Sequence, residues 1–183
     1  MRRRLFTVPN QLTFLRLGLL PLYFISIVYG HWRSALLLLV LAGLTDGLDG
    51  LMARRLDQKT ELGTFLDPIA DKLLLSISFV LLAYKKEIGW WLAILVLARD
   101  AIILIIATVI LLVVGYRTFP PTVAGKSTTV LQIMLVVVVI SGAAFSYPWH
   151  ERTQGILEYA AAALTVISGV QYSILIARGV SSK

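Results

Sequence analysis

The chain contains no cysteine and only two histidines in 183 residues. The absence of cysteine excludes disulfide bonds and thiolate metal sites, although it does not indicate a cellular compartment. Charge is also scarce, because Asp, Glu, Lys and Arg make up 15% of the residues, whereas soluble domains carry roughly a quarter. With so few nitrogen and sulfur ligands, any metal site in this chain should be built from oxygen atoms.

Apolar residues are abundant instead, at 58% of the chain with a mean hydropathy of +0.84. Several apolar runs reach the length of about 20 residues that a helix needs to cross a bilayer. The first run follows a basic start and has no small-residue cleavage site, which favours a retained span over a signal peptide. We therefore expect an all-α, polytopic membrane protein of one domain (1–183), in which 1–9 is a basic juxtamembrane segment. The six expected transmembrane helices are approximately Leu12–Tyr29, Ala35–Arg54, Leu62–Tyr84, Trp90–Val114, Thr128–Phe145 and Ile156–Ala177.

The distribution of Lys and Arg predicts the orientation. Most of them fall in the N-terminal segment, the C-terminus and the loops on the same side, so the positive-inside rule places both termini in the cytoplasm. Basic loops beside anionic lipid also account for the net charge of +7 without a nucleic-acid partner. We expect an integral protein of the cytoplasmic membrane of a prokaryote, with its active site facing the cytoplasm.

Four aspartates lie within the second and third expected helices, namely Asp46, Asp49, Asp67 and Asp71. In the predicted topology both pairs occupy the cytoplasmic half of the membrane on adjacent antiparallel helices. Each ionised aspartate in a span costs about 2.5–3.5 kcal/mol, so the cluster must be partly protonated or neutralised. Two divalent cations would balance four carboxylates, and Mg²⁺, Mn²⁺ and Ca²⁺ all prefer such oxygen ligands. A pair of such ions is a common device for clamping phosphate oxygens during displacement.

Small residues accompany the aspartates at Gly50, Ala53 and Gly63. They leave space for a ligand beside the metal ions, or they allow two helices to pack closely. Both interpretations stay open on the sequence alone, and the acidic neighbours favour the ligand.

The full pattern is Asp46-x-x-Asp49-Gly50-x-x-Ala53-Arg54, eight residues, then Gly63-x-x-x-Asp67-x-x-x-Asp71. It resembles the signature of the CDP-alcohol phosphotransferases, and every fixed position of that signature is filled. The first helix, with Asn10, Thr13 and Arg16, and the basic element Gly125–Thr129 are also similar to that family. With six spans in the matching order, the resemblance covers nearly the whole chain.

The resemblance implies a transfer reaction in which an acceptor alcohol attacks the lipid-linked phosphorus of CDP-diacylglycerol and CMP leaves. It implies two divalent cations, Mg²⁺ or Mn²⁺, and a homodimer. Asp71 would complete the metal site and act as general base on the acceptor hydroxyl. The metal ligands would be Asp46, Asp49, Asp67 and Asp71, and the CDP-binding residues would be Asp49, Gly50, Ala53, Arg54 and Gly63.

The acceptor is less directly indicated. The stretches around Asn10, Asp67 and Lys126 resemble phosphatidylglycerophosphate synthases, which use glycerol 3-phosphate, and this is our first expectation. Arg99-Asp100 departs from the Arg-Glu expected there and is similar to the CMP-forming cardiolipin synthases, whose acceptor is phosphatidylglycerol. The expected acceptor-binding residues are Arg16, Asp100, Arg117 and Lys126.

Two charged features within the spans have a structural alternative. Arg99 and Asp100 point about 100° apart on a helix, so they need not pair with each other and could form ion pairs with other helices. Lys72 could simply neutralise its neighbour Asp71 or extend toward the membrane surface. A cation transporter could also use intramembrane acids, but it would need a route to the outer face, away from these aspartates. A membrane scaffold would explain neither the acids nor the glycine spacing.

Overall fold

The structure, a computed structural model, describes the backbone of residues 8–55, 61–114, 123–148 and 150–181. Side chains are described for residues 14–45, 72–105, 125–148 and 150–172. The described part of the chain consists of six α-helices and contains no strand, which confirms the all-α prediction for these residues. The helices are α1 (Val8–Val28), α2 (Trp32–Arg55), α3 (Glu61–Tyr84), α4 (Trp90–Val114), α5 (Val123–Phe145) and α6 (His150–Ser181).

The helix boundaries agree with the apolar runs at most ends and extend past them at others. The fourth helix was expected at Trp90–Val114 and has these bounds. The sixth helix was expected at Ile156–Ala177, whereas α6 runs from His150 to Ser181. The backbone hydrogen-bond ladder continues into polar sequence, because a helix turn does not require an apolar side chain at every position. Apolar length therefore predicted where each helix lies but underestimated α6.

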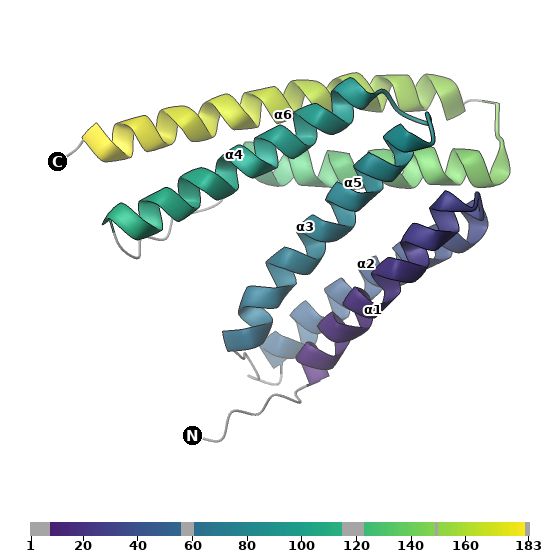
Figure 1. Cartoon of the computed structure of the whole chain (residues 1–183), viewed down its shortest axis with the longest axis horizontal. Coiled ribbons are helices and arrows are strands. Elements are labelled where there is room, and N and C mark those ends of the chain that lie inside the picture. Colours follow the sequence, from purple (N-terminus) through teal and green to yellow (C-terminus); the bar gives the residue numbers. More distant parts are fainter. Residues whose placement is uncertain (1–7, 56–60, 115–122, 149, 182–183) are drawn as a thin grey trace.

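The helices do not pack only with their neighbours in sequence (Figure 1). The consecutive pairs α1–α2, α3–α4 and α5–α6 are in contact, as short connections predict. Contacts also join α1 to α3, α2 to α5, α3 to α5 and α4 to α6. Figure 1 shows α4 and α6 side by side along one edge of the molecule. The arrangement brings α3, α4, α5 and α6 around a common region.

A continuous apolar core fills the space between these helices. Phe79, Leu82, Leu92, Leu135 and Ile140 are all fully buried or nearly so. They come from α3, α4 and α5, and large side chains of this kind contribute most of the burial energy of a core. The core thus fixes how α3, α4 and α5 pack together.

Many large apolar side chains lie on the outside. Leu104 is 70% exposed, and Leu22, Leu37 and Ile94 are each more than half exposed. An apolar exterior on this scale is typical of a surface that contacts lipid or another protein. Among the described residues, one helical segment, Gly125–Phe145, is long and apolar enough to cross a membrane. Shorter apolar segments are Phe14–Val28, Trp32–Thr45 and Lys72–Tyr84.

Neutral polar side chains also pair inside the core. The Tyr23 hydroxyl on α1 lies 2.7 Å from the Ser78 hydroxyl on α3. Ser78 also donates to the carbonyl of Leu74, at 2.7 Å. On the other side of the molecule Gln132 of α5 donates to Thr165 of α6, at 3.3 Å. These pairs join helices without leaving a charged group in the interior.

Candidate functional site

The aspartate motif lies across the end of α2 and the beginning of α3. Asp46 and Asp49 belong to the last turns of α2, and Asp67 and Asp71 to the first three turns of α3. The side chains of all four lie outside the described residues, as do those of Gly50, Ala53, Arg54 and Gly63. The helix ends are Arg55 and Glu61, and a connection this short spans at most about 20 Å. The backbone therefore keeps the two acidic segments at the same end of the helix pair.

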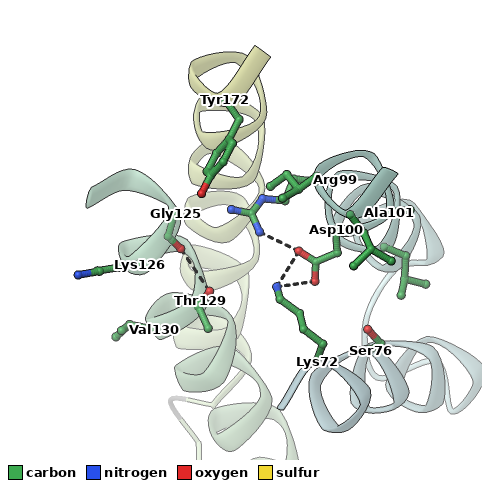
Figure 2. A pocket seen from close by; sticks show the side chains of 13 residues that line it. Lys72, Ser76, Arg99, Asp100, Ala101, Gly125, Lys126, Thr129, Val130 and Tyr172 are labelled. Atoms are coloured by element: carbon green, nitrogen blue, oxygen red, sulfur yellow. Dashed lines mark hydrogen bonds and ion pairs between the residues drawn. The ribbon is translucent and has the colours of Figure 1, made fainter. Parts of the chain in front are cut away.

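A cavity of about 780 Å³ lies beside this motif, among α3, α4, α5 and α6 (Figure 2). Lys72, the residue after Asp71 in the chain, is one of its lining residues. The other described lining residues are Ser76, Leu97, Arg99, Asp100, Ala101, Ile103, Leu104, Gly125, Lys126, Thr129, Val130 and Tyr172. Pockets of roughly 300–1,000 Å³ are typical of sites for small molecules and cofactors.

An ion-pair network forms one wall of the cavity. The Lys72 ammonium donates to both carboxylate oxygens of Asp100, at 2.8 and 2.9 Å. The Arg99 guanidinium donates to the same carboxylate at 2.7 Å and to the Ser168 hydroxyl at 2.6 Å. Figure 2 shows Lys72 reaching across from α3 to Asp100 on α4. The network thus joins α3, α4 and α6.

The sequence left open whether Arg99 and Asp100 pair with each other, and the structure shows that they do. The two side chains converge although their Cα–Cβ bonds diverge by about 100°, because the long arginine side chain bends back to its neighbour. Lys72 neither projects freely nor serves only as a neighbour of Asp71, since its ammonium is held by Asp100. The alternative of an ion pair with another helix is confirmed through Lys72.

The opposite wall comes from α5 and α6. Gly125, Lys126 and Thr129 line the cavity from the first two turns of α5, and Thr129 donates to the carbonyl of Gly125 at 3.2 Å. Figure 2 shows the Lys126 side chain directed away from the ion pair and the Tyr172 hydroxyl directed toward the cavity. Lys126 is thus among the residues of the cavity wall, and its role in acceptor binding stays a prediction.

The lining residues give the cavity an excess of positive charge. Lys72, Arg99 and Lys126 are cations, and Asp100 is the one acidic residue among the described lining residues. Leu97, Ile103, Leu104 and Val130 supply apolar surface. Such a cavity suits a ligand that combines a phosphate or another anion with an apolar part.

The remaining expected acceptor-binding residues have different positions. Arg16 is fully buried on α1 and does not line this cavity. Arg117 lies outside the described residues. Of the four expected residues, the structure therefore brings together Asp100 and Lys126.

Comparison with known proteins assigns the family. The family model for CDP-alcohol phosphatidyltransferase matches residues 6–167, which is most of the chain. This chain belongs to the CDP-alcohol phosphatidyltransferase family. It is accordingly a transferase of phospholipid biosynthesis and a membrane-associated protein.

Individual relatives of this phosphatidyltransferase fall into two groups by name. Human cardiolipin synthase (CMP-forming) is 36% identical over 161 residues, which cover 77% of this chain and 52% of the human protein. The probable phosphatidylglycerophosphate synthase of Mycobacterium tuberculosis (strain ATCC 25618 / H37Rv) is 34% identical over 180 residues. That alignment covers 93% of this chain and 82% of the mycobacterial protein. The chain is similar to both groups to nearly the same degree, so these names do not distinguish the acceptor.

The donor atoms of the phosphatidyltransferase motif suit hard divalent cations. Among the described side chains, no three His, Asp or Glu residues lie together, and the four motif aspartates fall outside that set. The backbone places these aspartates on two helix ends joined by a short connection. Carboxylate oxygens are ligands that Mg²⁺ and Mn²⁺ prefer, so the residue types of the motif are compatible with such ions.

Several lining residues of the cavity were not predicted from the sequence. Lys72 and Ser76 are four residues apart on α3 and line the cavity together. That spacing marks one helix face and could have indicated them. Tyr172 lines the cavity from α6, and Ser168 of α6 contacts Arg99 of α4; both depend on the packing of α6 against α4, which no local pattern indicates.

Proposed function

We propose that this chain transfers the phosphatidyl group of CDP-diacylglycerol to glycerol 3-phosphate, giving phosphatidylglycerophosphate and CMP. The observation that carries the proposal is the cavity lined by Lys72, the residue after Asp71 in the chain. An acceptor that carries a phosphate would find the partly exposed Lys72 ammonium there. The resemblance of the motif to the family signature supports the donor.

The proposed chemistry is an in-line displacement at phosphorus. The acceptor hydroxyl oxygen attacks the lipid-linked phosphorus, the bond from that phosphorus to the oxygen of CMP breaks, and Asp71 takes the hydroxyl proton. Two divalent cations held by Asp46, Asp49, Asp67 and Asp71 would supply charge neutralisation of the diphosphate and of the departing CMP. Asp49, together with Gly50, Ala53, Arg54 and Gly63, would bind the CDP portion.

We further propose that all six helices cross the membrane and that both termini face the cytoplasm. The exposed apolar side chains of α1, α2, α4 and α5 support this arrangement. A site at the cytoplasmic membrane surface would admit the lipid donor laterally and the soluble acceptor from the cytoplasm.

Phosphatidylglycerol is a second candidate acceptor, which would make the chain a CMP-forming cardiolipin synthase. Asp100 and the apolar lining favour it, because a cavity of about 780 Å³ with Leu97, Ile103, Leu104 and Val130 in its walls can take more than a three-carbon phosphate. The similarity to human cardiolipin synthase also supports this candidate.

Purified protein with CDP-diacylglycerol and each acceptor in turn tests the proposal. We expect CMP release and phosphatidylglycerophosphate with glycerol 3-phosphate, and loss of both on removal of divalent cations. Asp71→Asn should lower turnover by about 10²–10⁴-fold, the usual contribution of a general base. Asp57→Asn changes an aspartate of the same stretch outside the motif and should leave turnover unchanged.

Three outcomes would contradict the proposal at different levels. Turnover with phosphatidylglycerol alone would replace glycerol 3-phosphate by the second candidate. Full activity of Asp71→Asn would remove the assigned base, and full activity without divalent cations would remove the metal site.

A further inference from the structure

The ion pair between Lys72 and Asp100 lines the cavity, and its two side chains differ in how exposed they are. The Asp100 carboxylate receives three hydrogen bonds, two from Lys72 and one from Arg99. Its side chain is only 12% exposed, whereas that of Lys72 is 46% exposed. Asp100 is therefore largely buried and held by two cations, and Lys72 is the more exposed member of the pair.

The Lys72 ammonium has one N–H beyond the two that Asp100 receives. An ammonium carries three donors, and the two contacts with Asp100 direct the third away from that carboxylate. Lys72 and Ser76 line the same cavity from α3. An anion in the cavity can therefore bind Lys72 without displacing Asp100.

Asp100 is also held in place by a hydrogen bond from Arg99. Arg99 is 8% exposed and spans from Asp100 to the Ser168 hydroxyl of α6. Charge-assisted hydrogen bonds of this kind are directional and stronger than neutral ones, so they hold the carboxylate in one place. The position of the Lys72 ammonium is thus set by α4 and α6, although Lys72 belongs to α3.

We propose that Lys72 binds the negatively charged group of the acceptor and that Asp100 is the positioning residue that holds Lys72 in place. This inference rests on the proposed function, because it concerns the acceptor of that reaction. It applies to the phosphate of glycerol 3-phosphate and to that of phosphatidylglycerol, since the recognised chemistry is the same. An ion pair that only joins helices would instead affect stability and leave acceptor binding unchanged.

Steady-state kinetics with acceptor varied at saturating CDP-diacylglycerol provide the first test. Lys72→Gln and Asp100→Asn should each raise the KM for the acceptor by about 10- to 100-fold, the range for losing one hydrogen bond to a charged group. The KM for CDP-diacylglycerol should change less than about twofold. The double variant should be no worse than the poorer single variant, because both remove one interaction. Asp100→Glu, which keeps the charge, should restore part of the acceptor affinity.

Matched controls separate positioning from folding. Lys86→Gln removes an exposed lysine in the turn after α3, remote from the cavity, and should leave both KM values unchanged. Tyr23→Phe weakens a buried contact between α1 and α3 and should lower the melting temperature without changing the acceptor KM. Additive effects of Lys72→Gln and Asp100→Asn on KM, or loss of stability with unchanged KM, would overturn the inference.

A measurement without turnover distinguishes failure of this inference from failure of the proposed function. Amine acylation of Lys72, followed by mass spectrometry with Lys86 as internal reference, should be slowed by inorganic phosphate in the unaltered protein. The protection should be lost in Asp100→Asn. Absence of protection of Lys72 overturns the inference even if CMP is released. Protection without CMP release from either acceptor supports the anion site and contradicts the proposed function.

Discussion

Two polar networks that join helices of this molecule differ in which groups they leave available for a ligand. The Tyr23–Ser78 pair is neutral and closed, because Ser78 also donates to the Leu74 carbonyl. The Lys72–Asp100–Arg99–Ser168 network is charged and borders a cavity of about 780 Å³. The first network only joins α1 to α3, whereas the second joins α3, α4 and α6 and presents a partly exposed cation. Charge beside a cavity is therefore the feature that separates a site from a structural contact in this fold.

Breaking the charged network at Arg99, its most buried charged member, should have the largest effect. Arg99→Met leaves the Asp100 carboxylate, which is 12% exposed, with Lys72 as its remaining partner in the network. Removal of one partner from a buried ion pair costs about 3–5 kcal/mol. We expect a clear fall in the melting temperature and in turnover, measured by thermal unfolding in detergent and by CMP release. A variant with unchanged stability would show that Arg99 carries no such role.

Breaking the neutral pair should cost less and spare the reaction. Tyr23→Phe removes one hydroxyl and keeps the ring, while Ser78 retains its bond to the Leu74 carbonyl. A hydrogen bond of this kind contributes about 0.5–1.5 kcal/mol. Thermal unfolding should show this small loss, and CMP release below the melting transition should match that of the unaltered protein. A loss of turnover in a folded Tyr23→Phe variant would contradict the prediction that this pair only joins helices.

The contact of Lys85 with the end of α1 involves a charge that does not line the cavity, and removing it should have a smaller effect. The Lys85 ammonium donates to the carbonyl of Val28, the last residue of α1, at 2.9 Å. Cations at helix C-termini contribute about 0.3–1 kcal/mol. Lys85→Met should lower the free energy of unfolding by that amount and leave the acceptor KM unchanged. An altered KM would mean that charge alone, wherever it lies, influences the site.

The smallest effect is expected where a neutral contact is incomplete. Gln132 is fully buried and its amide donates to Thr165 at 3.3 Å, while its carbonyl oxygen has no hydrogen-bond partner among the described residues. Gln132→Leu removes that unsatisfied oxygen at similar volume, and Thr165 keeps its bond to the Ala161 carbonyl at 2.6 Å. We expect a change within about 1 kcal/mol, in the stabilising direction if the lost amide bond is weak. A strong destabilisation would indicate that the oxygen has a partner in the membrane-embedded protein.

The sequence predicted the helices well for a local reason. An apolar run such as Trp90–Val114 specifies its own helix, because its length and composition leave no other way to satisfy the backbone in an apolar setting. The misjudged ends are those where polar residues continue the ladder, as at His150 and Val123. The family was also accessible from the sequence, because the spacing of Asp46 to Asp71 is a local pattern on two consecutive helices.

The contacts in the wall of the cavity, in contrast, could not be predicted from the sequence. Asp100 was expected near the acceptor, but its partners were not, since Lys72 lies 28 residues away in the chain and Ser168 lies 69 residues from Arg99. No periodicity or composition links α4 to α6, and the two meet because their side chains pack, not because a loop joins them. Arg16 shows the converse, as a basic residue that resembles the family pattern and yet is fully buried away from the cavity.

By itself the sequence determined six helices, an acidic motif across two of them, and membership of a phosphatidyltransferase family, because each depends on residues close together in the chain. The tertiary structure alone decided that Lys72 meets Asp100 and that Arg99 reaches Ser168. Those contacts depend on how non-consecutive helices pack, and helix packing is set by the shapes of many distant side chains together.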